Sequence, residues 1–191
     1  MEEMVGSSLR EYKQMGISGA VLVRSRKFLS KTEGWIREDV NFSEITNYLG
    51  SRFDAKSIFT IWSPKGVIRG GHLEGRSRFT MVEHGVAFMV LVDMRPGDGQ
   101  GKVETFYLGD SKLAWGESVV IPEGVVAAYV SVSDECLSVW VGNRPYNKFD
   151  SLLTLDLFDS ELDIHWPEGT IPQLMGEGTK ILPLKRFLKK I

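Results

Sequence analysis

The segment Ala87-Phe88-Met89-Val90-Leu91-Val92 is an apolar run that leads into the turn sequence Arg95-Pro96-Gly97-Asp98-Gly99. An apolar run of this length, bounded by Pro and Gly, predicts a buried β-strand followed by a tight turn. Similar runs recur from residue 57 to 142, at Ser57–Trp62, Val67–Ile68, Phe79–Val82, Glu104–Leu108, Ser118–Ile121, Ala127–Val132 and Cys136–Val141. Many short strands separated by turns predict an antiparallel sandwich or barrel.

The size and composition of the chain limit what it can be. With 191 residues, 42% hydrophobic and 25% charged, it is expected to form one globular domain over residues 1–191, with a barrel core at about 57–142. A net charge of −2 provides no general field for nucleic acid or membranes, so neither is expected as a partner. The acidic N-terminus lacks a signal peptide's apolar region and no apolar run is long enough to span a membrane, which predicts a cytoplasmic protein.

Two segments outside the strands have helical character. Phe42, Ile45 and Leu49 recur at helical spacing before Gly50, which predicts a short helix within residues 42–52. The Lys/Arg-rich tail Leu182–Ile191 is a second candidate. The expected protein is therefore mainly β, with a few short helices mostly near the C-terminus.

One cysteine, Cys136, lies inside a strand-like apolar run. A single cysteine excludes an intramolecular disulfide, and no CxxC-type metal motif is present. A small thiol within such a run is more often part of the core than a nucleophile, so we predict a buried core residue.

The motif Gly66-Val67-Ile68-Arg69-Gly70-Gly71-His72 leads from a glycine-rich turn into a strand. It places a cation and an imidazole close together, where glycines leave room for a ligand. Considered alone, the pattern leaves two interpretations open, because a single histidine on a strand is more often structural than catalytic.

Two further polar motifs have simpler interpretations. Asp93 and Arg95 flank a strand end and predict a pair that stabilises the turn. The stretch Asp159–Pro167 contains His165 among carboxylates, but nothing else has metal-site spacing. We interpret this stretch as a loop capped by Trp166.

Four motifs in order resemble the dTDP-4-dehydrorhamnose 3,5-epimerase family. They are Gly66–His72, Val92–Arg95, Ile121–Gly124 and Asp159–Pro167, and the resemblance covers about residues 20–185. It implies a cupin-type jelly-roll β-barrel that forms a homodimer and uses no metal or other cofactor. The implied ligand is a nucleoside diphosphate 4-keto-6-deoxyhexose, and the implied setting is surface-polysaccharide or deoxysugar biosynthesis.

The resemblance also assigns roles to residues. His72 corresponds to the base that removes a proton beside the sugar ketone, where the resulting enolate is stabilised by a cation. Arg69 and Arg78 correspond to cations that contact the ligand. Tyr146 corresponds to an aromatic packed on the nucleotide base, and Glu38 to an acidic residue near the nucleotide that the partner subunit can supply.

Several family positions are replaced. The position of the proton-donating tyrosine holds Trp140, whose indole N–H is a hydrogen-bond donor but not a usable acid near neutral pH, and which we place in the substrate site. A second family histidine corresponds to Ala127. Where the family has carboxylates, this chain has Met89 and Gly178, with Glu177 adjacent to the latter. Glu33 takes the place of a family arginine, and Phe59 and Ile61 take the places of polar residues.

The sequence leaves three functional classes open. The expected one is an enzyme, an altered epimerase or isomerase in which His72 removes a proton beside the ketone. The proton is then returned by His72 itself, by water or by a replacement such as Tyr129. The alternative is an inactive relative that binds sugar nucleotides. The third is a barrel whose interior is filled by apolar side chains and which serves only for assembly.

Overall fold

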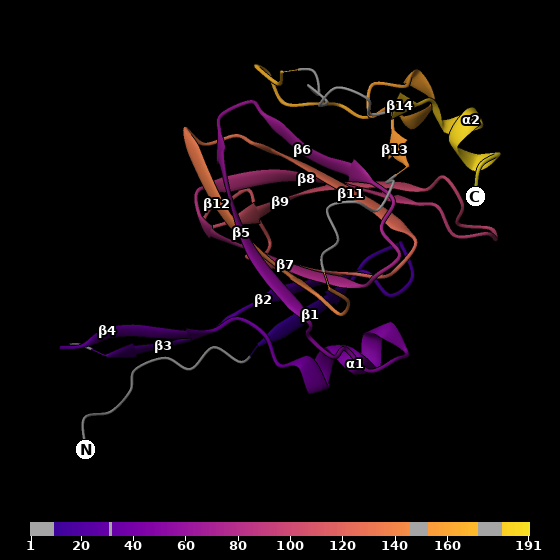
Figure 1. Cartoon of the computed structure of the whole chain (residues 1–191). Helices are drawn as coiled ribbons and strands as arrows, with labels where there is room; N and C mark the ends of the chain where they lie inside the picture. The colour runs from indigo at the N-terminus through magenta and orange to yellow at the C-terminus, as the bar shows by residue number, and fades with distance from the viewer. Residues whose placement is uncertain (1–9, 31, 146–152, 172–180) are drawn as a thin grey trace.

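The computed structural model describes residues 10–30, 32–145, 153–171 and 181–191. Its strands form two six-stranded sheets (Figure 1). In order, the first sheet contains β1 (Glu11–Gln14), β2 (Val21–Arg24), β10 (Ser118–Ile121), β7 (Arg78–His84), β12 (Glu135–Gly142) and β5 (Ser57–Pro64). The second contains β14 (Ile181–Leu182), β13 (Thr154–Leu155), β6 (Ile68–His72), β11 (Val125–Ser131), β8 (Val86–Asp93) and β9 (Val103–Gly109).

The order of the strands is that of a jelly roll. Strands β5, β12, β7 and β10 of the first sheet face β6, β11, β8 and β9 of the second, and most connections pass from one sheet to the other. All eight strands expected between residues 57 and 142 are present, with ends that differ by a few residues. The prediction of a mainly β, jelly-roll fold is therefore confirmed.

Strands β8 and β11 of the second sheet are buried on both faces, which explains their nearly continuous apolar sequences. Along β8, Met89 and Leu91 point into the barrel, whereas Phe88, Val90 and Val92 point outward. The outward residues are covered by the C-terminal segment, the orange-to-yellow layer of Figure 1, through Leu155, Leu157, Leu162, Leu182 and Phe187. Burial on both faces removes the alternation expected of a strand with one wet face.

The short helix predicted within residues 42–52 is α1 (Phe42–Leu49), and it packs on the outer face of the first sheet. Asn41 caps its first turn, accepting a hydrogen bond from the Ser43 N–H, and Gly50 ends it at a φ of 67°. The buried side chain of Ile45 packs on the outer face of the sheet. A 3₁₀ turn (Ser160–Leu162) and α2 (Leu184–Leu188) lie in the C-terminal segment, so the second expected helix is present but shorter.

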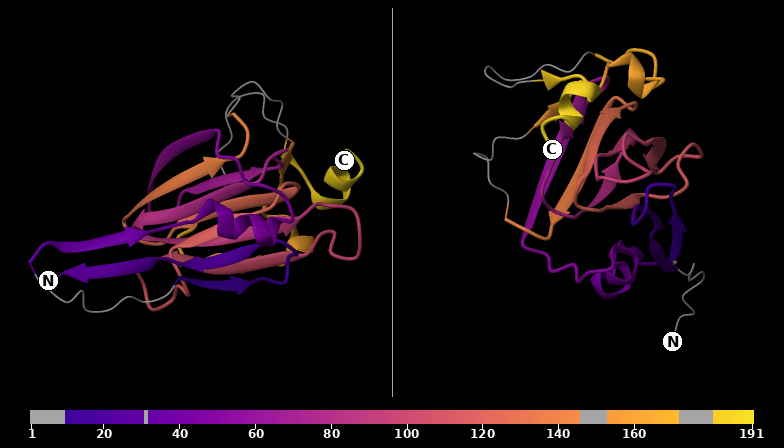
Figure 2. Two further views of the ribbon diagram at one scale, coloured as in Figure 1. Left: turned by 90° about the horizontal axis from the view of Figure 1, so that it is seen from below. Right: turned by 90° about the vertical axis from the view of Figure 1, so that its right-hand side faces the viewer.

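A hairpin of β3 (Arg26–Ser30) and β4 (Gly34–Glu38) extends away from the barrel (Figure 2). The sequence did not predict it, because its residues show neither clear alternation nor a two-residue turn motif. Trp35 and Ile36 are exposed on it. No helix in the described part of the chain is long and apolar enough to cross a membrane.

The motifs interpreted as structural have the expected contacts. The Asp93 carboxylate accepts hydrogen bonds from the Arg95 backbone and guanidinium, which closes the turn. Trp166 packs edge-on against Phe88. Cys136 is fully buried, and burial raises the pKa of its thiol to about 11, so it is an inert core residue.

Candidate functional site

A cavity of about 240 Å³ opens inside the barrel, between the inner faces of the two sheets. The interior is therefore not completely filled by side chains, which argues against the assembly-only hypothesis. Most of its wall comes from β5, β6, β7, β11 and β12, and its lining residues are Phe59, Ile61, Arg69, Gly70, His72, Glu74, Arg78, Ala127, Tyr129 and Trp140.

A β-bulge brings Arg69 and His72 to the same side of β6. Residues three apart on a regular strand point to opposite faces, yet both side chains line the cavity. On the neighbouring strand β11, Ala127 pairs with His72 and Ala128 pairs with Gly70. Gly71 has no partner between them, so it is the extra residue of a β-bulge. Gly70 has a φ of 98°, and a Cβ there would lie 2.3 Å from the Ala127 carbonyl oxygen, so only glycine fits.

His72 is half-buried, and its ring is held from outside the barrel core. Its Nδ1 lies 2.8 Å from the Thr154 hydroxyl on β13. Burial lowers the pKa of His72 and Arg78 lowers it further, while Glu74 acts in the opposite direction. The imidazole is therefore neutral at ordinary pH, the form that can accept a proton.

A buried ionic cluster lies beside the histidine. Arg78, on β7, is only 2% exposed and donates hydrogen bonds to the Glu74 carboxylate (3.1 Å) and the Val125 carbonyl (2.5 Å). Glu74 also pairs with Arg76 at 2.5 Å. Burial lowers the pKa of Arg78, but a guanidinium stays charged in proteins. The cavity thus holds a fixed positive charge close to a neutral base.

A network of hydrogen bonds joins the two sheets at the cavity. Tyr129 lies on β11, beside Arg69 of β6, whereas Ser63, Ser138 and Trp140 belong to β5 and β12 of the first sheet. The Tyr129 hydroxyl lies 2.9 Å from the Ser63 hydroxyl and accepts a hydrogen bond from Ser138 at 3.2 Å. The Trp140 indole N–H donates to the same Ser138 hydroxyl at 3.0 Å. Burial raises the pKa of Tyr129. The position expected to hold the family's acid therefore presents an indole whose N–H already bonds a serine.

Apolar side chains make up much of the remaining cavity wall. Phe59 and Trp140 are cross-strand partners on β5 and β12, and Ile61 lies two residues further along β5. Together with Ala127 they line the cavity. Met89 does not reach it, because its side chain is buried in the inner core.

Of the six predicted site residues, four lie together in the cavity: Arg69, His72, Arg78 and Trp140. Glu38 does not join them within one chain, since it lies on the β3–β4 hairpin and forms an ion pair with Arg10 at 2.6 Å. Tyr146 lies outside the described residues, as do Glu177 and Gly178.

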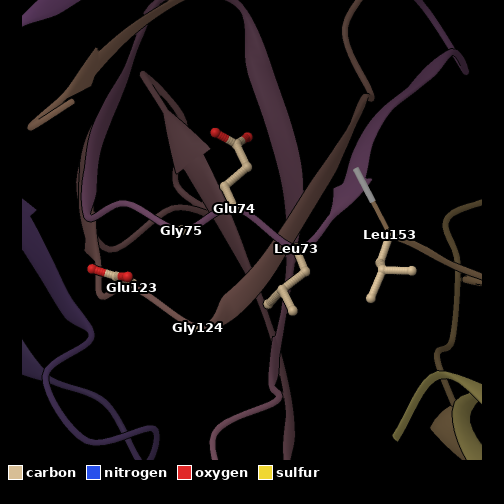
Figure 3. Close-up of a pocket in the computed structure, with 6 residues that line it drawn as sticks. All are labelled: Leu73, Glu74, Gly75, Glu123, Gly124 and Leu153. Carbon is tan, nitrogen blue, oxygen red and sulfur yellow. The ribbon is translucent and has the colours of Figure 1, made fainter. Parts of the chain in front are cut away.

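Two site residues were missed by the sequence analysis. Glu74 lines both the barrel cavity and an adjoining pocket of about 330 Å³, which also includes Leu73 and Glu123 (Figure 3). In Figure 3 the Glu74 side chain projects away from that of Leu73. Its position two residues after His72, on the same side of the chain, was a usable signal. Thr154 lies in a two-residue strand far along the chain and offered none.

A family model described as dTDP-4-dehydrorhamnose 3,5-epimerase matches residues 14–183, most of the chain. The chain belongs to this family. Two curated members, both named dTDP-4-dehydrorhamnose 3,5-epimerase, are similar to it. The protein of Methanothermobacter thermautotrophicus is 28% identical over 169 residues, covering 83% of the chain and 85% of the relative. The protein of Mycolicibacterium smegmatis is 25% identical over 135 residues, covering 68% of the chain and only 63% of the relative's length.

Solved structures of epimerases share the fold of this family member. A 4-keto-6-deoxy sugar epimerase from the novobiocin gene cluster of Streptomyces spheroides superposes with a TM-score of 0.83 at 22% identity, over 100% of this chain and 95% of that one. A 3′-monoepimerase from Streptomyces bikiniensis, solved with dTDP-quinovose, gives a TM-score of 0.73 at 20% identity, over 92% and 94% of the two chains. At these identities the likeness establishes the fold.

Proposed function

We propose that this family member is a sugar-nucleotide epimerase that moves a proton beside the ketone of a nucleoside diphosphate 4-keto-6-deoxyhexose, with His72 as the base. The observation that carries the proposal is the shared cavity of a neutral imidazole and two guanidinium groups, those of Arg69 and Arg78. A base beside fixed positive charge is what enolate formation requires. The pathway is surface-polysaccharide or deoxysugar biosynthesis.

The chemistry follows from the acidity of carbons next to a ketone. The His72 imidazole takes the proton from C3 or C5, and the electrons of the broken C–H bond move to the carbonyl oxygen. Arg78 stabilises the resulting oxyanion. The enolate then regains a proton at the same carbon, and delivery to the opposite face inverts that centre.

The barrel cavity fits a sugar better than a whole sugar nucleotide. Its volume of about 240 Å³ lies just below the roughly 300–1,000 Å³ of common ligand pockets. We place the hexose inside and the nucleotide at the rim. There Arg69 is exposed, and its guanidinium forms no hydrogen bond or ion pair with any described residue, so it is available to a phosphate.

The replaced acid favours inversion at one centre. Trp140 cannot donate a proton near neutral pH, so the opposite face is left to water or to Tyr129. With a single weak donor, a one-centre reaction is more natural than inversion at both C3 and C5. The Streptomyces bikiniensis relative, a 3′-monoepimerase by name, shows that this fold accommodates a one-centre reaction.

Hydrogen exchange with solvent tests the proposal. The protein is incubated in D₂O with a dTDP-4-keto-6-deoxyhexose, and deuterium at C3 and C5 is followed by NMR. We expect incorporation at one carbon, abolished in His72→Asn, while calorimetry shows dTDP binding unchanged. Absence of exchange at both carbons with intact binding would contradict it.

That outcome would instead support the alternative, an inactive relative that binds sugar nucleotides. The replaced acid at Trp140 favours it, since a protein that only binds needs Arg69 and Arg78 but no proton donor. In that case both the wild type and His72→Asn would bind dTDP equally and neither would exchange deuterium.

We further propose a homodimer. Exposed apolar side chains occur on the projecting hairpin (Trp35, Ile36) and on β5 (Ile58, Trp62), which forms one edge of the first sheet. Light scattering coupled to gel filtration is expected to give twice the chain mass of 21.5 kDa. A Trp35→Glu, Ile36→Lys double variant that stays dimeric would place the interface elsewhere.

A further inference from the structure

A buried hydroxyl group fixes the histidine of the barrel cavity. Thr154 is fully buried, and its Oγ1 lies 2.8 Å from His72 Nδ1. The two residues are direct partners across β13 and β6, and the Leu73 N–H donates to the Leu153 carbonyl at 2.9 Å beside them. The backbone therefore holds the hydroxyl against one ring nitrogen. The other, Nε2, has no hydrogen-bond partner among the described residues.

The electrostatic surroundings of His72 come from other elements. Burial lowers its pKa, Arg78 lowers it further and Glu74 raises it. From β13, the strand that contacts Nδ1, only the neutral hydroxyl reaches the ring. The charged and titratable side chains that share its cavity are Arg69 on β6, Glu74 after β6, Arg78 on β7 and Tyr129 on β11.

We propose that Thr154 is a positioning residue: its hydroxyl accepts a hydrogen bond from the Nδ1–H of His72 and so keeps the Nε2 lone pair directed into the cavity. The inference deepens the proposed function, since it rests on His72 being the base. A neutral imidazole carries its proton on one nitrogen only, and the partner of that nitrogen selects the tautomer. Once Nε2 has taken the substrate proton, both ring nitrogens are donors, and the same bond to Thr154 persists.

A hydroxyl group differs from a carboxylate in this place. A carboxylate would also orient the ring, but it would stabilise the imidazolium and raise the pKa of the histidine. Thr154 orients the ring without adding charge. The site therefore orients its base without the increase in pKa that a carboxylate would cause.

The test is ¹⁵N NMR of the histidine rings in the full-length, substrate-free protein. The chain has three histidines, so His84 and His165 serve as internal references, and His72→Asn assigns the third set of signals. Ring ¹⁵N shifts give the tautomer, and a pH titration gives the midpoint. The matched variants are Thr154→Ser, which keeps the hydroxyl, Thr154→Val, which keeps the shape, and Thr154→Asp.

We expect the wild type and Thr154→Ser to carry the proton on Nδ1 of His72. Thr154→Val should lose this preference and slow the deuterium exchange about tenfold or more, since the base is no longer oriented. Thr154→Asp should raise the His72 midpoint by about one to two pH units. If the threonine were purely structural, Thr154→Val would change thermal stability without changing the tautomer of His72.

The proposal is overturned if the wild-type ring is protonated on Nε2, or if Thr154→Val leaves tautomer and midpoint unchanged. Because both are read without substrate, they separate this inference from the proposed function. If the expected tautomer is found but no deuterium exchanges at C3 or C5, the epimerase proposal is contradicted, whereas the proposed role of Thr154 in orienting His72 still holds. If Thr154→Asp does not fold, the comparison of Thr154→Ser with Thr154→Val still tests the proposal.

Discussion

The indole ring of Trp140 stacks on the phenol ring of Tyr129 inside the barrel, with centroids 6.0 Å apart and an interplanar angle of 27°. The two side chains share the Ser138 hydroxyl, which receives the indole N–H and donates to the phenol oxygen. The two sheets are therefore joined here by a packed and hydrogen-bonded unit. Among the described residues that line the cavity, Tyr129 is the one phenol, and its oxygen is already bound by two serines.

Removing that phenol oxygen should destabilise the fold. In Tyr129→Phe the buried hydroxyls of Ser63 and Ser138 lose their shared partner, and each unsatisfied group costs about 1–3 kcal/mol. We expect the free energy of unfolding in urea to fall by about 2 kcal/mol. Tyr107→Phe is the control, because no hydrogen bond of the Tyr107 hydroxyl is present among the described residues. An equal loss in both variants would contradict the network.

The β-bulge at Gly70 and Gly71 should not tolerate a side chain at Gly70. Gly70→Ala combines a φ of 98° with a Cβ placed 2.3 Å from the Ala127 carbonyl oxygen. Gly34→Ala, at a φ of 91° with nothing within 4 Å of the new Cβ, isolates the backbone strain, which costs about 1–3 kcal/mol. In thermal melts we expect Gly70→Ala to lose clearly more stability than Gly34→Ala. Equal losses would mean that the bulge relaxes without cost.

The same bulge separates the features that the sequence predicts from those that it does not. The strands were predictable because Pro, Gly and Asp end each apolar run, and the runs are short enough to exclude helices. The sequence also brought Arg69 and His72 together as a motif. Their common orientation, however, depends on the extra residue of the bulge. A strict alternation of faces along β6 would wrongly place Arg69 and His72 on opposite faces of the sheet.

The contacts of the site that join distant segments were not predictable from local pattern. Thr154 reaches His72 across 82 positions of the chain, from a strand of two residues. The projecting hairpin was missed for a related reason: Trp35 and Ile36 are exposed, so the burial that drives hydrophobic periodicity is absent there. The charge cluster of Glu74 and Arg78 forms where the end of β6 meets β7, which local spacing only partly indicates.

His72 should make stability depend on pH. Its folded pKa lies below that of the unfolded chain, about 6.5, so the unfolded state binds the proton more readily. Above about pH 6.5 the ring is neutral in both states and contributes nothing. As the pH falls below that value the folded state is progressively disfavoured, until the folded pKa is passed.

This dependence is measurable by subtraction. The difference in unfolding free energy between wild type and His72→Asn is expected to be constant above about pH 7 and to shift against the wild type as the pH falls below about 6.5. His165→Asn provides the control, because that side chain is 89% exposed. A difference that stays flat across this range would show that the folded protein does not perturb His72.

Glu74 should hold Arg78 in place. Glu74→Gln keeps the shape but removes the charge that pairs with the buried guanidinium, and breaking a buried ion pair costs about 3–5 kcal/mol. Because Arg78 also bonds the Val125 carbonyl, we expect the lower end of that range in urea unfolding. Glu123→Gln is the matched control, since its pair with Arg144 is solvent-exposed and such pairs contribute about 0–1 kcal/mol.

Trp140→Tyr should supply a proton donor to the opposite wall of the cavity. A phenol at this position replaces an indole that cannot act as an acid, and a positioned general acid contributes roughly 10²–10⁴-fold to proton transfer. We expect the ratio of inversion to simple deuterium exchange to rise about tenfold or more, since the new side chain competes with water for the enolate. The measurement is NMR of product stereochemistry and deuterium content in D₂O.

Trp140→Phe separates the acid from the space that it occupies. Both variants remove the indole N–H bond to Ser138 and shrink the same wall, but only tyrosine introduces a hydroxyl. The phenylalanine variant is therefore expected to exchange deuterium without gaining inversion. If the ratio of inversion to exchange rises as much in Trp140→Phe as in Trp140→Tyr, Trp140 acts by limiting the access of substrate or water. The absence of an acid at this position would then not explain the course of the reaction.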